Sequence, residues 1–450
     1  MSKRIVILGA GESGMGAALL AKSKGYDVFV SDAAAIEPSF KNELIENKIH
    51  FEEFKHSIDK LKGVDLVIKS PGIPFGIPIV NKVLEEGIEV IDELEFAYQH
   101  TTKPIIAITG TNGKTTTTLL IHHLLTQSGI NAGLAGNVGH SLARQVINDI
   151  AEVYVVEMSS FQLEGVKTFR PKIAIILNIT PDHLDRYNND FEQYAKAKMR
   201  MVQQMDKPDL ILYFGDDRSL QERVEDLEKW PQRAYIGFTG GIQSMGYRTD
   251  KGLYIFTLKG KYDIAPKYWP LKGEHNVLNM LFAIHAVLEY GVSIEQILTH
   301  LPSFKNVPNR MEYITSINDV DFVNDTKATN VEAVYYALGS YSNIIWIAGG
   351  QDKGNDYTQI ATLAAEKVKA MVCLGADNKK LTDFFEQIVS HISETKNVKE
   401  AVQMAFEYAD KGDVVLLSPA CASFDLFDNY AQRGDLFKKA VFELKSEIDG

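Results

Sequence analysis

The sequence predicts an α/β protein with three domains built mainly on parallel sheets. Its 450 residues exceed what one ordinary hydrophobic core organises. Short apolar runs alternate with helical patterns along the whole chain, as expected for parallel strands joined by helices. Proline-containing stretches at residues 101–104 and 302–308 indicate linkers. We therefore expect domains at residues 1–95, 96–304 and 305–450.

The apolar runs give the expected strands in chain order. In the first domain they are residues 5–8, 28–30 and 65–69, with a helix over 15–24. In the second domain the expected strands are residues 106–108, 153–157, 173–178 and 210–214. Helices are expected there over residues 191–205 and 276–290. Short alternating runs with glycine turns between 233 and 270 predict an antiparallel excursion on the main sheet. The third domain repeats the rhythm with strands at 322–323, 344–348, 371–374 and 414–417.

Composition and charge exclude several classes of protein. The net charge of -12 argues against a broad nucleic-acid-binding surface, and no stretch is long enough to span a membrane. The start of the chain lacks the pattern of a signal peptide. Cys373 and Cys421 both follow apolar runs, which predicts buried thiols in a reducing cytoplasm and not a disulfide framework. Cys421 as a nucleophile would need a base, and nothing in the sequence positions one.

A glycine-rich loop at residues 109–116 predicts a phosphate-binding site. An apolar strand runs into Gly110 and Gly113, and a helical pattern follows the second glycine. Such a loop directs backbone N–H groups and a helix N-terminus at an anion. Lys114 is placed to reach the outer phosphates, and the Thr115 hydroxyl to hold Mg²⁺. The loop has two residues between its glycines, fewer than the four of the usual triphosphate loop.

A second glycine loop, residues 9–14, follows the first expected strand. Asp32 ends the next strand, at about the spacing of an acid that binds a ribose. This pattern fits a dinucleotide, and hence a dehydrogenase, and it fits equally a nucleotide diphosphate such as a nucleotide-sugar. A tight turn without any ligand remains a further interpretation.

Two polar residues are expected at one edge of the central sheet. Glu157 ends the strand at 153–157, where a carboxylate beside a phosphate loop commonly holds Mg²⁺. His183 lies in the loop after the next strand, so a parallel sheet brings it to the same edge as Glu157. Its imidazole is a candidate metal ligand, although a loop histidine standing alone usually has no such role.

Lys198 lies on the inward face of its expected helix. Phe191, Tyr194, Lys198, Met201 and Met205 recur at spacings of three and four residues. Burial lowers the pKa of a lysine, and a neutral amine reacts with carbon dioxide to give a carbamate that can bind Mg²⁺. Alternatively, the stem of Lys198 packs against the core while its ammonium reaches water.

Further candidates follow along the chain. Asn276 and Asn279 begin an apolar helix and suit a purine or a phosphate, while Asn276 also suits a plain N-cap. The third domain carries the runs NRME from residue 309, NDTKATN from 324, GGQDKG from 349 and SPACASFD from 418. Arg310 is placed to reach phosphates, and the backbone N–H groups near Ser423 suit a carboxylate.

Read together, these motifs resemble the Mur ligases, the ATP-dependent amide-forming enzymes of peptidoglycan precursor synthesis. The resemblance spans the whole chain and rests on TGTNGKT, GNVG, EMSS, NITPDHLDR, Lys198, GEHNVLN, NRME, NDTKATN and GGQDKG. The runs SPACASFDLF and NYAQRGDLF resemble the corresponding runs of the family members that add D-glutamate to UDP-N-acetylmuramoyl-L-alanine. The sequence lacks the D-N-P-R motif of the members that add diaminopimelate or lysine.

The resemblance implies a fold and a reaction. The first domain would be Rossmann-like and bind the UDP-sugar, the central one P-loop ATPase-like, and the C-terminal one Rossmann-like and bind the amino acid. The substrate carboxylate would attack ATP to form an acyl phosphate, which the amine of D-glutamate then attacks. Partners would be these small molecules alone, with no nucleic acid and no membrane insertion, and the enzyme would be a cytoplasmic monomer.

The resemblance also assigns residues to sites. Catalysis is implied for Lys114, Glu157, His183 and Lys198. ATP binding is implied for Gly110, Thr111, Asn112, Gly113, Lys114, Thr115, Thr116, Asn276, Arg310 and Asp325. Two Mg²⁺ ions, with Mn²⁺ as the alternative, would bind Thr115, Glu157, His183 and carbamylated Lys198. The UDP substrate would contact Gly11, Ser13, Asp32, Ser70, Asn137 and His183. D-Glutamate would contact Lys327, Thr329, Lys353, Ser423, Phe424 and Tyr430.

The sequence departs from the family pattern at two places. Ala33 and Ala34 follow Asp32 where relatives carry Thr-Arg, and Tyr430 stands where phenylalanine is common. Three alternatives remain open at this point: another Mur-type or folylpolyglutamate-type ligase, a dehydrogenase, and a nucleotide sensor without catalysis.

Overall fold

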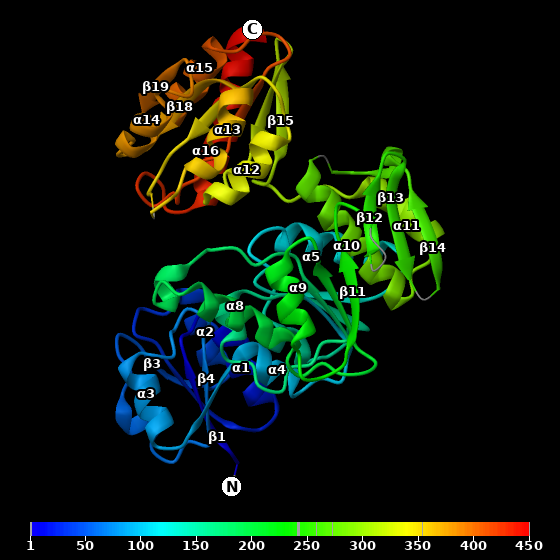
Figure 1. Cartoon of the computed structure of the whole chain (residues 1–450). Helices are drawn as coiled ribbons and strands as arrows, with labels where there is room; N and C mark the ends of the chain where they lie inside the picture. The colour runs from blue at the N-terminus through cyan, green and yellow to red at the C-terminus, as the bar shows by residue number, and fades with distance from the viewer. Residues whose placement is uncertain (1, 241–243, 258, 272, 353, 450) are drawn as a thin grey trace. The chain divides into compact units, whose positions relative to one another are not determined.

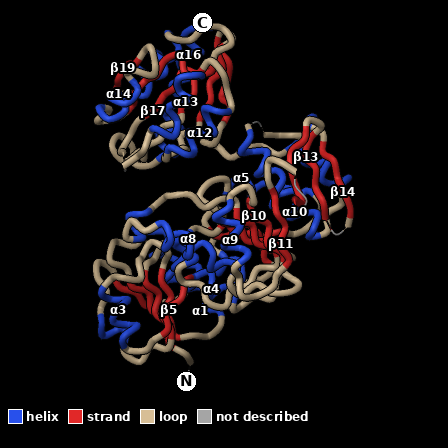
Figure 2. The backbone as a smooth tube through the Cα atoms, in the orientation of Figure 1, coloured by secondary structure: helices blue, strands red, loops and turns tan. Residues whose placement is uncertain are grey.

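The computed structural model describes residues 2–240, 244–257, 259–271, 273–352 and 354–449 (Figures 1 and 2). Three β-sheets, each covered by helices, form three α/β domains, which confirms the predicted fold class. The first two domains make one compact unit, residues 1–269 with 278–304, and the third makes another, residues 270–277 with 305–450. The expected domain boundaries stay predictions, and the one after residue 95 falls inside helix α4, Glu93–Tyr98.

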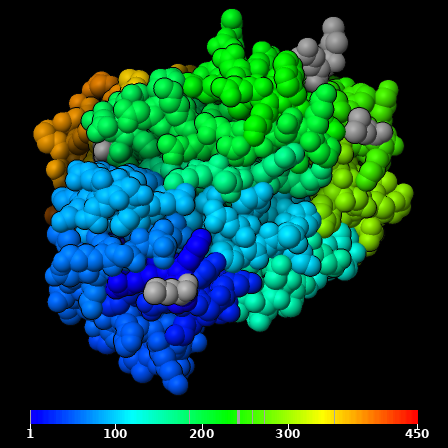
Figure 3. All heavy atoms as spheres, turned by 90° about the horizontal axis from the view of Figure 1, so that it is seen from below, coloured from blue at the N-terminus to red at the C-terminus, as the bar shows by residue number. Residues whose placement is uncertain are grey.

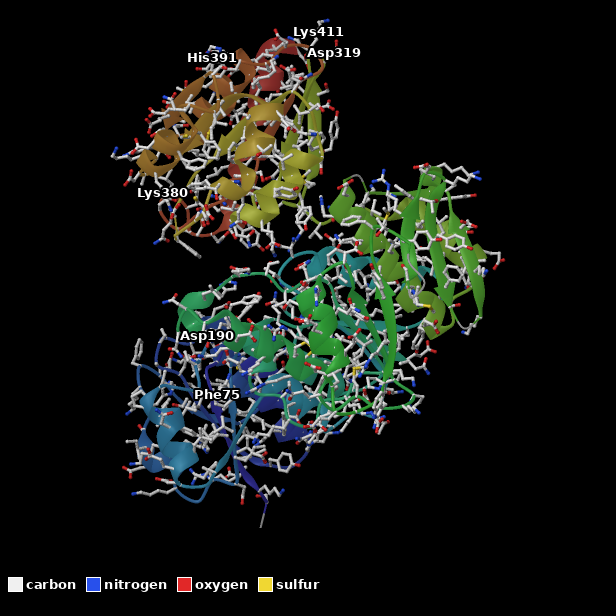
Figure 4. All side chains as sticks on the ribbon, viewed as in Figure 1. Phe75, Asp190, Asp319, Lys380, His391 and Lys411 are labelled. Carbon is white, nitrogen blue, oxygen red and sulfur yellow. The ribbon has the colours of Figure 1, made fainter. Side chains whose placement is uncertain are left out.

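The first sheet is wholly parallel, with strand order β3-β2-β1-β4-β5. Its strands are β1 Arg4–Leu8, β2 Asp27–Ser31, β3 His50–Glu52, β4 Leu66–Lys69 and β5 Glu89–Asp92. Helices α1 Glu12–Ser23, α2 Pro38–Glu46, α3 Pro78–Glu85 and α4, with a 3-10 turn at Ile58–Leu61, complete the domain. A fully buried ion pair joins Lys69 Nζ to Asp92 Oδ2 at 3.1 Å, and the ammonium lies 4.6 Å from the ring of Phe75 (Figure 4).

The central sheet has the order β14-β13-β12-β11-β10-β9-β6-β8-β7. Its parallel part consists of β6 Ile105–Thr109, β7 Ala132–Gly136, β8 Val153–Glu157, β9 Ile173–Ile176, β10 Leu210–Phe214 and β11 Gln232–Ile236. β12 Ser244–Thr249 pairs parallel with β11 and then begins the antiparallel meander of β13 Gly252–Thr257 and β14 Gly260–Ile264. This confirms the antiparallel excursion expected on the main sheet.

The helices of the central domain are α5 Lys114–Gln127, α6 Leu142–Val146, α7 Ser160–Leu163, α8 Phe191–Met199, α9 Arg218–Glu225, α10 Glu274–Tyr290 and α11 Ile294–His300. 3-10 turns lie at Leu184–Tyr187, Arg200–Val202, Pro266–Tyr268 and Leu301–Ser303. Asp190 caps α8 by accepting from Glu192 N at 2.8 Å (Figure 4). The helix expected to reach residue 205 ends at Met199, because the backbone tightens into the 3-10 turn there.

The first and central domains pack together mainly through α1 and α4 of the first domain against α6 of the central one. Figure 3 shows the blue first domain lying directly against the cyan part of the central domain. Arg144 on α6 forms a bidentate pair with Glu43 on α2, with hydrogen bonds of 2.6 Å and 3.0 Å. A Cβ atom added to Gly16 on α1 would lie 1.8 Å from Ser141 Oγ, so only glycine permits this approach. These contacts hold α1 and α2 of the first domain against α6 of the central domain.

The third sheet has the order β15-β16-β20-β17-β18-β19, with only β15 antiparallel. Its strands are β15 Glu312–Ile317, β16 Val320–Asn324, β17 Ile344–Ala348, β18 Val368–Leu374, β19 Ile392–Thr395 and β20 Val414–Leu417. Its helices are α12 Val331–Gly339, α13 Thr358–Lys367, α14 Lys379–Phe385, α15 Val398–Glu407 and α16 Tyr430–Asp449. On its surface Lys411 pairs with Asp319 at 3.3 Å (Figure 4).

Both cysteines are buried and unbonded, as expected, and burial raises the pKa of Cys373 to about 12 and of Cys421 to about 11. In the described part of the chain, every helix is too short or too polar to cross a membrane.

Candidate active site

The predicted phosphate loop connects β6 to α5. Gly110 has φ +154°, and Gly113 occupies the left-handed region at φ +84° directly before the helix. A Cβ on Gly113 would lie 2.4 Å from Asn279 Oδ1, so this turn requires glycine on both counts. The loop therefore delivers Lys114 as the first residue of α5, with its backbone N–H groups at the helix N-terminus.

Asn178 holds the loop from the neighbouring strand end. Its Oδ1 accepts from the backbone N–H groups of Thr111 at 2.9 Å and Asn112 at 2.8 Å, and its Nδ2 donates to Asn112 O at 3.2 Å. Thr111 Oγ1 also lies 3.0 Å from Tyr194 Oη. The sequence pattern gave Asn178 no role and placed Tyr194 in a packing stripe. The position of Asn178 at the end of a strand beside the loop is the signal that points to this contact.

Two lysines converge on the first glycine of the loop. Lys114 Nζ donates to the carbonyl oxygens of Gly110 and Thr111, both at 2.8 Å. Lys198 Nζ donates to the same Gly110 oxygen at 2.7 Å. Lys198 is 1% exposed, so the predicted inward face of α8 is confirmed and the alternative with a solvated ammonium is wrong. Burial, together with the charge of Lys114, holds the pKa of Lys198 well below its ordinary value.

Glu157 ends β8 in a buried position. Its Oε1 accepts from Asn137 Nδ2 at 2.8 Å. Its Oε2 has no hydrogen-bond partner among the described residues, although it is buried. An unsatisfied buried carboxylate oxygen beside a phosphate loop is the environment that a divalent cation would complete. Thr115, which is 4% exposed, supplies a hydroxyl at the start of α5.

His183 lies on the loop after β9, as the sequence predicts. Its backbone is left-handed at φ +52° and its side chain is 50% exposed. Nε2 lies 3.7 Å from Asp182 Oδ2, and the ring packs 5.2 Å from that of Phe161. Among the residues that the structure describes, no three histidine, cysteine, aspartate or glutamate side chains cluster as a metal site. A metal here would therefore need other ligands as well.

A cavity of about 510 Å³ joins these residues to the first domain. Its walls come from residues 12–13, 71–72, 136, 137, 139, 159–162 and 182–183, with the side chains of Lys114, Tyr194 and Lys198. Of the expected substrate contacts, Ser13, Asn137 and His183 line this cavity, while Gly11, Asp32 and Ser70 do not.

Asp32 and Ser70 instead stabilise the first glycine loop. Asp32 accepts from the backbone N–H groups of Ala10 at 2.6 Å and Ala34 at 2.8 Å. Ser70 Oγ donates to Gly9 O at 3.3 Å. The carboxylate of Asp32 therefore binds the backbone of the loop. Ala33 and Ala34 follow it, where the family resemblance led us to expect Thr-Arg.

The remaining ATP candidates lie in the second compact unit. Asn276 is buried in the first turn of α10, and since that helix begins at Glu274 the N-cap interpretation is wrong. Asp325 follows β16 and accepts from Met311 N at 3.2 Å and Ser418 Oγ at 3.1 Å. Burial raises the pKa of Asp325 to about 7, and the charge of Arg310 opposes that shift.

The amino-acid candidates gather at the carboxyl ends of β16 and β20. Lys327 Nζ donates to Tyr430 Oη at 3.1 Å and lies 4.8 Å from the centre of its ring. Thr329 N donates to Lys327 O at 2.9 Å. Ser423 is buried, whereas the side chain of Phe424 is exposed. Lys353 lies outside the described residues.

Arg433 organises this end of the third sheet, and it was not among the residues predicted from the sequence. It is 1% exposed and donates to Thr326 Oγ1 and Thr326 O at 2.9 Å, to Gly349 O at 3.2 Å and to Cys421 O at 3.3 Å. It therefore holds together the loops after β16, β17 and β20. Nothing in local sequence periodicity marks an arginine for such a position.

On an α/β scaffold, a glycine-rich loop at a helix N-terminus, a buried carboxylate with an unsatisfied oxygen and a buried lysine form the arrangement expected of a nucleotide-dependent enzyme. Three family models match the chain: the Mur ligase MurD-like N-terminal domain over residues 3–92, the Mur ligase middle domain over 108–287 and the Mur ligase glutamate ligase domain over 309–421. The chain belongs to the Mur ligase family.

Two relatives that match the chain over nearly its full length carry the same enzyme name. The chain is 46% identical, over 99% of its length and 100% of the relative, to the UDP-N-acetylmuramoylalanine--D-glutamate ligase of Cytophaga hutchinsonii. It is 44% identical to the enzyme of the same name from Christiangramia forsetii, over 99% of this chain and 100% of that one.

Solved structures share the fold at low identity. UDP-N-acetylmuramate-alanine ligase MurC from Thermotoga maritima matches with a TM-score of 0.60 and 18% identity, over 99% of this chain and 100% of that chain. MurF ligase from Thermotoga maritima in complex with ADP matches with a TM-score of 0.62 and 15% identity, over 98% and 99%.

Proposed function

We propose that the protein is an ATP-dependent ligase that joins D-glutamate to UDP-N-acetylmuramoyl-L-alanine in peptidoglycan precursor biosynthesis. The names of the full-length relatives support this activity. The structural observation that carries it is the meeting of Lys114 and Lys198 at Gly110, in a cavity that also contains Ser13 and Asn137 from the nucleotide-sugar candidates.

The proposed reaction has two steps. The substrate carboxylate attacks the γ-phosphorus of ATP, which breaks the bond to ADP and gives an acyl phosphate. The amine of D-glutamate then attacks the acyl carbon, loses a proton and expels inorganic phosphate. The chain needs no nucleophile of its own, because its contribution is to position the reactants and stabilise negative charge with Lys114 and the loop N–H groups.

Glu157 Oε2, the Thr115 hydroxyl, His183 and a carbamate on Lys198 are the proposed ligands for two Mg²⁺ ions, with Mn²⁺ as the alternative. The unsatisfied buried oxygen of Glu157 and the lowered pKa of Lys198 support this donor set. Bound Mg²⁺ would neutralise charge on the transferred phosphoryl group. Asn137 would orient Glu157 through its 2.8 Å hydrogen bond, in addition to its proposed contact with the UDP substrate.

The remaining contacts are proposed residue by residue. We assign the phosphates of ATP to residues 110–116 and the rest of the nucleotide to Asn276, Arg310 and Asp325. We assign the UDP substrate to Gly11, Ser13, Asp32, Ser70, Asn137 and His183. We assign D-glutamate to Lys327, Thr329, Lys353, Ser423, Phe424 and Tyr430. The pairing of Lys327 with Tyr430 supports the last group.

The proposal includes a cytoplasmic location and a monomeric state. The two unbonded buried cysteines agree with a reducing compartment. Sedimentation of the purified protein as a single chain would support the monomer.

ADP release with UDP-N-acetylmuramoyl-L-alanine across a panel of D- and L-amino acids tests the function. We expect stimulation by D-glutamate and by no other member of the panel. Stimulation by a different amino acid alone would identify another Mur-type or folylpolyglutamate-type ligase instead.

A further inference from the structure

The turn that carries His183 also carries Arg186, which the proposed reaction does not use. Arg186 lies in the 3-10 turn Leu184–Tyr187, and its backbone N–H donates to His183 O at 3.1 Å. Its side chain is only 13% exposed. A guanidinium keeps its charge and presents five donors, so a nearly buried arginine needs specific acceptors.

Two groups of acceptors hold the guanidinium. Nε and Nη2 donate to the two carboxylate oxygens of Glu164, at 3.0 Å and 2.9 Å, in a bidentate pair. Nη2 also donates to Pro71 O at 3.0 Å, and Nη1 donates to Gly72 O at 3.4 Å. The ring of Phe161 lies 4.2 Å from the guanidinium carbon. Arg186 therefore joins a turn of the first domain to two segments of the central domain.

The segments that Arg186 joins are walls of the cavity, while Arg186 itself does not line it. Pro71 and Gly72 belong to one wall, and Phe161 and His183 to another. His183 has a left-handed backbone, which is uncommon outside glycine and persists only where the surroundings fix it. The bond from Arg186 N to His183 O is one of the contacts that fix it.

We propose that Arg186 is a positioning residue for the nucleotide-sugar substrate, which sets the separation between the Pro71–Gly72 turn and His183. The inference rests on the proposed function, because it assumes that the UDP substrate occupies this cavity. Arg186 acts through Glu164, Pro71 and Gly72 and touches no substrate. Its loss would widen the substrate site and leave the phosphate loop in place, since no hydrogen bond joins Arg186 to residues 109–116 among the described contacts.

The chain offers a matched control in the same domain. Arg223 on α9 forms a bidentate pair with Glu192 on α8, with hydrogen bonds of 2.9 Å and 2.6 Å. Neither residue lines the cavity. Substitution of Arg223 therefore removes a bidentate ion pair of the same type, although a more exposed one, without removing a contact to the proposed substrate wall.

The test compares Arg186→Met, Arg186→Lys and Glu164→Gln with Arg223→Met. For Arg186→Met we expect the KM for UDP-N-acetylmuramoyl-L-alanine to rise about tenfold or more, with the KM values for ATP and D-glutamate within about twofold of wild type. Arg186→Lys should recover only part of the loss, because an ammonium cannot span Glu164 and both carbonyls. Calorimetric titration with the UDP substrate alone should show the same rise in Kd.

Several results would overturn the inference. One is an unchanged KM and Kd for the UDP substrate in Arg186→Met. Another is an equal rise in all three KM values that follows a fall in Tm, which would mark a merely structural role. If Arg186→Met does not fold, Glu164→Gln decides, with an expected selective rise of about threefold in the same KM. Failure of the proposed function would look different, because wild type itself would then not bind the UDP substrate.

Discussion

Lys198 donates from Nζ to the carbonyl oxygen of Gly110 across 2.7 Å, so a lysine on α8 contacts the first glycine of the phosphate loop. Lys114 donates to the same oxygen at 2.8 Å. Burial and, after it, the nearby charge of Lys114 disfavour protonation of Lys198, and together they hold its pKa well below the ordinary value. This direction of the shift favours the neutral amine, which is the form that reacts in the proposed carbamylation.

The first prediction concerns Lys198. Lys198→Met should lower kcat by about a hundredfold, because the proposed metal ligand is lost. Lys196→Met, on the exposed face of the same helix, should leave kcat unchanged. Steady-state ADP release measures both. Retention of most activity by Lys198→Arg would contradict the carbamate, since a guanidinium does not form one.

The second prediction concerns the phosphate loop. Gly113→Ala should lower kcat/KM for ATP by about tenfold or more. The new Cβ would clash with Asn279 Oδ1, and the left-handed backbone at this position disfavours any residue with a Cβ. Gly129→Ala is the control, since Gly129 has a similar φ of +87° but open space around it. Comparable losses of kcat/KM in both variants would mean that backbone strain alone explains the effect.

The third prediction concerns stability against pH. Burial raises the pKa of Glu93 from 4.5 to about 8, and the neighbouring carboxylates of Asp92 and Glu12 contribute to that rise. The folded state thus retains a proton that the unfolded state releases between these two values. The stabilising contribution of this bound proton is complete below pH 4.5 and is lost as the pH rises to about 8.

Glu93→Gln removes this titration. The free energy of unfolding of wild type, measured with denaturant, should fall relative to the variant by up to about 1.4 kcal/mol for each pH unit in the window. Above the window the difference should become constant. Parallel pH profiles for the two proteins would refute the assignment to Glu93.

The fourth prediction concerns Tyr430. Tyr430→Phe removes the hydroxyl that accepts from Lys327 but keeps the ring beneath the ammonium. We expect the KM for D-glutamate to rise about fivefold, which corresponds to the free energy of about one hydrogen bond, and the KM for ATP to stay unchanged. Tyr408→Phe, which removes a hydroxyl bonded to Ser393 in the same domain, is the control. If the two variants gave the same KM for D-glutamate, Lys327 would not depend on Tyr430.

Much of the scaffold follows from the sequence because buried parallel strands are continuous apolar runs. The bounds predicted for β8, β10, β17 and β20 agree with the structure residue for residue. Helical periodicity likewise places Lys198 on the inward face of α8, whereas the burial of its ammonium is seen only in the structure. By contrast, β7 carries two glycines in five residues, and a composition of that kind predicts a turn.

The contacts between distant segments could not be predicted. Arg186 meets Pro71 across 115 residues of sequence, and Arg433 meets Thr326 across 107. Periodicity reports which face of an element is buried, not which loop will supply the acceptor. Asn178 shows an intermediate case, since its motif was recognised but its bonds to Thr111 and Asn112 depend on two strands lying side by side.

In the proposed reaction, the chain activates a substrate carboxylate by phosphorylation and then joins it to D-glutamate. The direct measurement is mass spectrometry of inorganic phosphate after turnover of UDP-N-acetylmuramoyl-L-alanine that carries ¹⁸O in its free carboxylate. The account predicts that one labelled oxygen enters phosphate for each amide formed, and only when ATP and D-glutamate are both present. Amide formation with unlabelled phosphate, or no D-glutamate-dependent phosphate at all, would contradict it.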